Sequence, residues 1–189
     1  EKIIPDLEDK CIRAMNITYN IEDEILIQKE TVFADPHIWL DFSIFVKEIK
    51  NVASELIEID PSNRDLYAKN AENYISKINT LDKLYADSLV DCKFDSFITN
   101  HDAFAYLAFH YNLEMISISG ISPEAEPNPQ SMAELSDIIK NKGIKYILTE
   151  SLVSQKIAET LAEEVGAQTL ILNPLEGLTD EEIKNGKGY

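Results

Sequence analysis

The sequence predicts an α/β fold with a parallel sheet, and two observations carry this prediction. Four short apolar segments in residues 92–189 are typical of buried strands, and they lie at 94–100, 114–119, 145–150 and 167–173. Segments with helical periodicity separate them, near 102–111, 130–141 and 153–165. Strands that alternate with helices form βαβ units. We therefore expect a three-layer lobe in which helices cover both faces of a parallel sheet.

The first half of the chain has a different pattern. Residues 3–16 are expected to form a short helix and residues 24–28 a strand, and a strongly apolar helix follows at about 38–58. Pro61 ends that helix. From residue 62 to about residue 90, apolar side chains recur at alternating steps of four and three, which predicts a long amphipathic helix. Such a helix is either part of a helical bundle or a rigid strut between two lobes, and the pattern fits both.

The composition excludes several classes of protein. The chain has 189 residues, 44% of them hydrophobic, which suits one large domain or two small ones. Its formal charge of −17 repels phosphate backbones and anionic lipid, so nucleic-acid binding is excluded, whereas a cation is tolerated. No run of about 18 apolar residues is present to span a membrane. Cys11 and Cys92 have no metal or disulfide spacing, and we expect two buried thiols.

Two of the three histidines follow the ends of predicted elements. Asp35 is expected to cap a helix that has His37 in its first turn, and Asn100 to cap a helix that begins at His101. Ligands of open α/β sheets bind beyond the carboxyl ends of the strands. The positive end of a helix dipole disfavours imidazolium, and a neutral ring suits a metal ion. His110 would lie about 13.5 Å further along the same helix as His101, on the opposite side, so it cannot share an ion with it.

Several carboxylates could complete a metal site. Glu150 and Glu176 follow predicted strands, while Glu124 and Glu126 lie in the proline-rich loop 120–130. In so acidic a chain, any one of them could equally be a solvated surface group. A site of histidines and a carboxylate is the resulting hypothesis. A metal-dependent hydrolase would also need a general base beside an open coordination position, and the sequence contains no HExxH, GxSxG or P-loop motif.

Five motifs in order resemble one known family: DPHIW, DPSNRDLYAKNA, NHDAF with the following AYLA, GISPEAEPNP and TLILNPLEGLT. This is the family of zinc-specific solute-binding proteins of bacterial ABC importers, the ZnuA- and AdcA-like cluster A-I, and the resemblance runs from about residue 3 to residue 189. It implies two α/β lobes with parallel sheets, joined by one long rigid helix, with the metal in the cleft between them. Residues 1–60 would then be a partial N-terminal lobe, 61–91 the linking helix and 92–189 the C-terminal lobe.

The resemblance also implies a ligand set. His37, His101 and Glu176 match family positions that hold zinc. A further family histidine would belong to a segment upstream of Glu1, together with the opening strand and helix of the first lobe, so we expect the first lobe to be incomplete. Four other acidic residues are expected to support the ligands or to line the cleft: Asp102, Glu124, Glu126 and Glu150.

His101 decides the expected metal, because manganese-binding relatives carry a carboxylate at its position, and nitrogen ligands suit Zn²⁺ better than the harder Mn²⁺. Manganese, alone or with zinc, is the alternative. The implied function is extracytoplasmic capture of Zn²⁺ and delivery to the membrane permease of an ABC importer, without enzymatic activity. We expect a full-length monomer in the periplasm or lipid-anchored on the outer face of a Gram-positive membrane. An adhesin is a further possibility, since some relatives are described that way.

Overall fold

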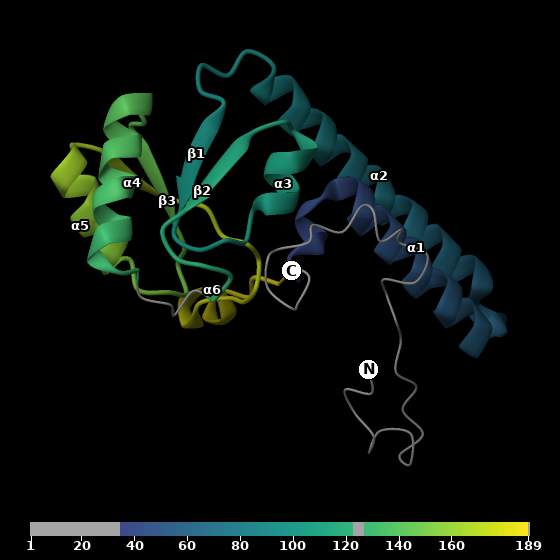
Figure 1. The fold of residues 1–189 in the computed structure, drawn as a ribbon. Coiled ribbons are helices and arrows are strands. Elements are labelled where there is room, and N and C mark those ends of the chain that lie inside the picture. The colour runs from purple at the N-terminus through teal and green to yellow at the C-terminus, as the bar shows by residue number, and fades with distance from the viewer. Residues whose placement is uncertain (1–34, 123–126, 189) are drawn as a thin grey trace. The chain divides into compact units, whose positions relative to one another are not determined.

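The computed structural model describes residues 35–122 and 127–188, and these residues form two compact units (Figure 1). Residues 41–87 belong to a helical unit, whereas residues 35–40 and 88–188 belong to an α/β unit. The helix predicted at 3–16, the strand predicted at 24–28, Glu124 and Glu126 all lie outside the described residues. In the part of the chain that is described, no helix combines the length and the hydropathy needed to cross a membrane.

The described residues of the helical unit form two long helices. They are α1 (Phe42–Ile59) and α2 (Arg64–Leu89), and the 3-10 turn η4 (Pro61–Asn63) connects them. The long amphipathic helix predicted from residue 62 to about residue 90 is therefore confirmed as η4 and α2. The rings of Phe45 and Tyr74 meet edge to face between the two helices, with 6.0 Å between their centroids.

The start of α1 differs from the prediction. The expected helix at 38–58 is split into a 3-10 turn, η3 (Ile38–Leu40), and α1 itself. The break occurs because the carboxylate of Asp41 accepts hydrogen bonds from the backbone N–H groups of Ser43 and Ile44, at 2.8 and 3.2 Å. These bonds satisfy donors that a helix leaves free in its first turn, so Asp41 and not Asp35 begins the helix.

The α/β unit contains a four-stranded parallel sheet with the order β2–β1–β3–β4, as the alternating pattern predicted. Its strands lie within the four predicted segments: β1 (Ser96–Thr99), β2 (Glu114–Ser117), β3 (Tyr146–Thr149) and β4 (Gln168–Ile171). Three predicted helices connect them: α3 (Ala105–His110), α4 (Pro129–Lys142) and α5 (Lys156–Val165). Figure 1 shows α4 and α5 on one side of the sheet and α3 on the other, which makes the expected three layers.

The core of this unit lies between the sheet and the pair α4–α5. Ile98 of β1, Ile147 of β3 and Leu161 of α5 are completely buried within it. Gly143 and Gly166 end α4 and α5 with φ angles of 66° and 71°. Glycine adopts this left-handed conformation without steric strain, whereas residues with a side chain are strained in it. Each helix therefore stops shortly before the next strand, β3 or β4, begins.

Two further features were not expected. A short helix, α6 (Asp180–Lys184), follows the sheet, and Thr179 and Glu182 form its capping box. The sequence carries the matching pattern of a threonine followed three residues later by a glutamate. Cys92 is exposed, so the prediction of a buried thiol is wrong at that position, while Cys11 lies outside the described residues.

Candidate metal centre

His37 lies in the short segment before η3 and not in the first turn of an α-helix, so that prediction is wrong. Asp35 explains the difference. One oxygen of its carboxylate, Oδ1, accepts a hydrogen bond from the backbone N–H of His37 at 3.0 Å and pairs with Nδ1 of the same imidazole at 2.7 Å. Both side chains are buried. The carboxylate expected to cap a helix therefore fixes the backbone and ring of His37.

His101 follows β1, in a loop that precedes α3, so the prediction that it begins the helix is also wrong. The loop is held by Thr99, whose hydroxyl donates a hydrogen bond to the carbonyl of His101 at 2.9 Å. Nδ1 of His101 is hydrogen-bonded to the carboxylate of Glu150, which directly follows β3. Because β1 and β3 are parallel neighbours, their carboxyl ends meet and bring His101 and Glu150 together.

The ring of His101 has an unusual free atom. The side chain is completely buried, and its Nε2 has no hydrogen-bond partner. Buried polar atoms are nearly always satisfied in folded proteins, and an exception points to strain, to chemistry or to a missing ion. A neutral imidazole whose Nδ1 carries the hydrogen presents a lone pair at Nε2, which is the form that binds a metal ion.

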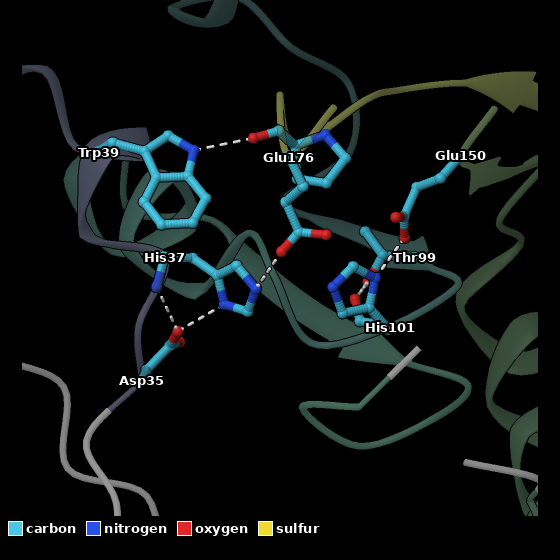
Figure 2. Close-up of polar contacts among 8 residues, drawn as sticks. Asp35, His37, Trp39, Thr99, His101, Glu150 and Glu176 are labelled. Carbon is cyan, nitrogen blue, oxygen red and sulfur yellow. Dashed lines mark hydrogen bonds and ion pairs between the residues drawn. The ribbon is translucent and has the colours of Figure 1, made fainter. Parts of the chain in front are cut away.

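Glu176 reaches the same point from the loop after β4 (Figure 2). Its Oε1 lies 2.9 Å from Nε2 of His37. The loop is turned back by Leu175, which has a positive φ of 63°, and it is tied down by Trp39, whose indole N–H donates to the carbonyl of Pro174 at 2.8 Å. The side chain of Glu176 is 35% exposed, so the carboxylate is the part of the site that solvent reaches.

The three side chains form a compact group of donors. One nitrogen from each of His37 and His101 and one carboxylate oxygen of Glu176 all lie within 4.8 Å of one another. The two imidazoles meet edge to face, with ring centroids 5.4 Å apart. Ligands of a tetrahedral zinc ion lie about 2.0–2.2 Å from the metal and so roughly 3.4 Å from each other. Small side-chain movements would close the group around one ion and leave a fourth position for another ligand.

The electrostatics of His37 differ from the expectation based on a helix dipole. Burial of the ring would lower the pKa of His37, but the hydrogen bonds and negative charges of Asp35 and Glu176 outweigh burial and raise it. The carboxylates, and not a helix terminus, therefore dominate the field at this ring. A metal ion at Nε2 of His37 would take the place of a proton on that nitrogen and contact Glu176, while Asp35 stays hydrogen-bonded to Nδ1.

The other predicted site residues have different places. Glu150 contacts His101 as described, and Asp102 is half-buried beside it without belonging to the group of three donors. His110 ends α3 with its ring against Tyr111, also outside that group, although it does not share a helix with His101. Asp35 and Trp39 were missed as parts of the site. Asp35 was interpreted as a helix cap, and only the fold shows that Trp39 reaches Pro174.

A parallel α/β unit that brings two buried histidines and a carboxylate together beyond its strands is typical of metal-binding α/β proteins. The chain belongs to the family described as zinc-uptake complex component A, periplasmic (ZnuA), whose model matches residues 4–189. The family resemblance and the α/β fold class expected from the sequence are thereby confirmed, and the family is one of solute-binding transport proteins.

Named relatives are similar over most of the chain. It is 44% identical over 155 residues to the high-affinity zinc uptake system protein ZnuA of Bacillus subtilis (strain 168), covering 82% of this chain and 49% of the relative. It is 43% identical over 155 residues to the zinc-binding lipoprotein AdcA of Streptococcus pneumoniae (strain R6), covering 82% of this chain and 31% of the relative. The chain thus spans half or less of the length of these curated relatives.

Solved structures show the same fold. A mutant structure of the laminin-binding adhesin Lmb of Streptococcus agalactiae superimposes with a TM-score of 0.85 at 31% identity, over 95% of this chain and 67% of that one. The AdcAII protein of Streptococcus pneumoniae gives a TM-score of 0.83 at 34% identity, over 93% and 66% of the two chains. These neighbours include one named as an adhesin, in line with the further possibility considered from the sequence.

Proposed function

We propose that this chain binds Zn²⁺ through Nε2 of His37, Nε2 of His101 and the carboxylate of Glu176, as part of a receptor for zinc import. The observation that carries the proposal is the compact group of three donor atoms, one of which is the buried and unpartnered Nε2 of His101. Zinc is the transported cargo. The fourth position of its tetrahedron is open to water or to a donor elsewhere in the protein.

The donor set favours zinc over manganese. Two imidazole nitrogens and one carboxylate are typical zinc ligands, whereas manganese prefers a larger share of oxygen donors. The curated relatives named above, ZnuA and AdcA, are described as zinc-uptake and zinc-binding proteins. Mn²⁺ at the same site is the second candidate, and a competition between the two ions distinguishes them.

Catalysis is not part of the proposed function. A zinc hydrolase needs a general base beside the open metal position. The two carboxylates next to the histidines, Asp35 and Glu150, are buried and engaged with Nδ1 of the rings. Neither is placed to activate a water at the metal. The described residues of the site therefore support capture and release of an ion.

The remaining parts of the proposal concern the cell. We propose that the protein works outside the cytoplasm, in the periplasm or anchored by lipid to the outer membrane face, and passes zinc to the permease of an ABC importer. The family description as periplasmic and the naming of AdcA as a lipoprotein support this location. The formal net charge of −17 also favours the approach of a divalent cation.

Isothermal titration of the metal-free chain with ZnCl₂ tests the binding site. We expect one zinc ion per chain, and His37→Ala and His101→Ala to weaken binding by more than about 100-fold, since loss of a ligand costs more than loss of an outer partner. His110→Ala is the matched control and should bind as the unaltered chain does. Equal affinities of the His101→Ala and His110→Ala variants would refute the site.

Uptake of radioactive zinc by cells that carry His101→Ala or His110→Ala in the chromosomal gene tests delivery.

A further inference from the structure

We infer that Asp35 and Glu150 are paired positioning residues, each of which fixes one imidazole so that both Nε2 atoms face the same metal ion. This inference rests on the proposed zinc site and adds two residues that act through the ligands. Both carboxylates are at most 3% exposed, and each contacts the Nδ1 atom of a different histidine (Figure 2). Carboxylate–histidine–metal arrangements of this kind fix the tautomer and raise the basicity of the ligand nitrogen.

Asp35 acts locally on His37. The same oxygen, Oδ1, accepts the backbone N–H and pairs with Nδ1, at 3.0 and 2.7 Å, so one atom sets both the backbone and the ring. Asp35 is itself held in place, because the hydroxyl of Tyr106 on α3 donates to its carbonyl at 3.3 Å. A carboxylate fixed in this way leaves the His37 ring little freedom to turn its Nε2 away from Glu176.

Glu150 acts on His101 from 49 residues away in the chain. It follows β3, and the next residue is bound to the end of β4, because the backbone N–H and the hydroxyl of Ser151 donate to Oδ1 of Asn173 at 2.8 and 2.9 Å. The side chain of Gln155 also donates to the carbonyl of Glu150 at 3.2 Å. Three neighbouring strand ends thus hold the carboxylate against Nδ1, while Nε2 of His101 stays free.

The two carboxylate–histidine pairs have the same chemistry, although one is local in the chain and the other joins distant segments. Burial of a carboxylate next to an imidazole is costly unless the pair is hydrogen-bonded and its charge is balanced. A zinc ion on the far side of both rings would offset most of the negative charge that Asp35, Glu150 and Glu176 bring to the site. A purely structural role would not require both rings to present the same nitrogen to the same point.

The test uses isosteric variants that remove charge but keep shape, Asp35→Asn and Glu150→Gln, with Glu164→Gln as the matched control. Glu164 is hydrogen-bonded to the hydroxyl of Ser136 and lies outside the site, so its loss removes one carboxylate from the same unit. We expect Asp35→Asn and Glu150→Gln each to weaken zinc binding by about 10–100-fold at unchanged stoichiometry. The control should leave the affinity unchanged.

Spectroscopy separates positioning from a general loss of structure. With Co²⁺ as the probe, the visible absorption bands report ligand geometry, and we expect them to shift in both site variants and not in Glu164→Gln. Nitrogen-15 NMR of the zinc-free chain reads the tautomer of His101 directly. We expect hydrogen at Nδ1 in the unaltered chain and a redistribution in Glu150→Gln. If that variant does not fold, Glu150→Asp keeps the charge but draws it away from the ring, and it should show the same loss.

The outcomes distinguish the inference from the function on which it rests. If His101→Ala abolishes zinc binding while Asp35→Asn and Glu150→Gln match the unaltered chain in affinity and Co²⁺ spectrum, the positioning role is wrong and the zinc site stands. If the unaltered chain binds no zinc, the proposed function fails. The His101 tautomer then still decides whether Glu150 orients the ring.

Discussion

The helical unit and the α/β unit differ in how they use their apolar residues. In the α/β unit, β1, β3, α4 and α5 close over a continuous core in which Ile98, Ile147 and Leu161 are 0% exposed. In the part of the helical unit that the structure describes, α1 and α2 bury only Ile44, Glu48 and Ile78. The two helices instead line an open, largely apolar groove of about 650 Å³.

The difference follows from geometry. A sheet covered by helices offers two faces and several neighbours to each apolar side chain, whereas two helices can bury only the stripe at which they meet. The α/β unit can therefore support buried polar groups such as His101 and Glu150, because strand ends and loops satisfy them. We expect substitutions in the two units to have unequal costs, and three predictions test that expectation in order of size.

The largest effect is expected for an isoleucine in the closed core. Ile147→Ala should lower the free energy of unfolding by about 3–4 kcal/mol, because it deletes a completely buried side chain from a central strand. Ile49→Ala, the matched change in the groove of the helical unit, should cost only about 1 kcal/mol, since Ile49 is half-buried and alanine favours helix. Urea unfolding followed by Trp39 fluorescence and by far-ultraviolet circular dichroism measures both. Equal costs would contradict the comparison.

Glu48 should produce a pH-dependent effect in the helical unit. Burial raises the pKa of Glu48 to about 7, and it is the only carboxylate among the residues that line the groove. Between pH 4.5 and about 7 the unfolded chain releases this proton more readily than the folded chain, so stability falls as the pH rises through that window. Glu48→Gln should remove this decline and stabilise the chain by about 2 kcal/mol at pH 8.

The measurement is a series of urea unfolding curves from pH 4 to pH 8. The two chains should have nearly equal stability at pH 4, where Glu48 is protonated in both states, and diverge as the pH increases. Glu164→Gln, which removes a carboxylate from an exposed position of α5, is the control for the loss of charge. If the free energies of unfolding of the unaltered chain and of Glu48→Gln differ by the same amount at all pH values, burial does not hold the proton on Glu48.

The sequence predicted the α/β unit well because its signals are local and repeated. Each strand is a short apolar segment, and the αL glycines Gly143 and Gly166 mark where helices stop. The convergence of His37, His101 and Glu176 was predicted from the family resemblance, and for the two histidines also from the rule that ligands gather beyond parallel strand ends. Their role as zinc ligands remains the proposal that titration tests.

The helix starts were predicted wrongly because each has more than one candidate cap. Asp35 and Asp41 both suit the start of the first helix, and local sequence does not show that the carboxylate of Asp35 is used by the His37 ring. Likewise, Asn100 suits a helix start, but the residues from His101 to Phe104 form a loop before α3. The pairing of Glu150 with His101 depends on the order of strands in the sheet, which periodicity does not contain.

The smallest expected effect concerns exposed charges. Lys83 and Asp87 form an ion pair within α2 with 2.8 Å between Nζ and Oδ2, and their side chains are 74% and 63% exposed. Lys83→Gln should therefore cost only about 0.3 kcal/mol, particularly because lysine precedes aspartate, the weaker orientation in a helix. Lys142→Gln makes the same change of charge, but Lys142 is 37% exposed and joins α4 to Glu114 of β2 at 2.6 Å. The unfolding midpoint of Lys142→Gln should therefore fall further than that of Lys83→Gln. Addition of 1 M NaCl should reduce the effect of Lys83→Gln more than that of Lys142→Gln, because salt screens exposed pairs most strongly. A larger loss at Lys83 would mean that surface contacts along α2 stabilise the helical unit as much as contacts between elements stabilise the α/β unit.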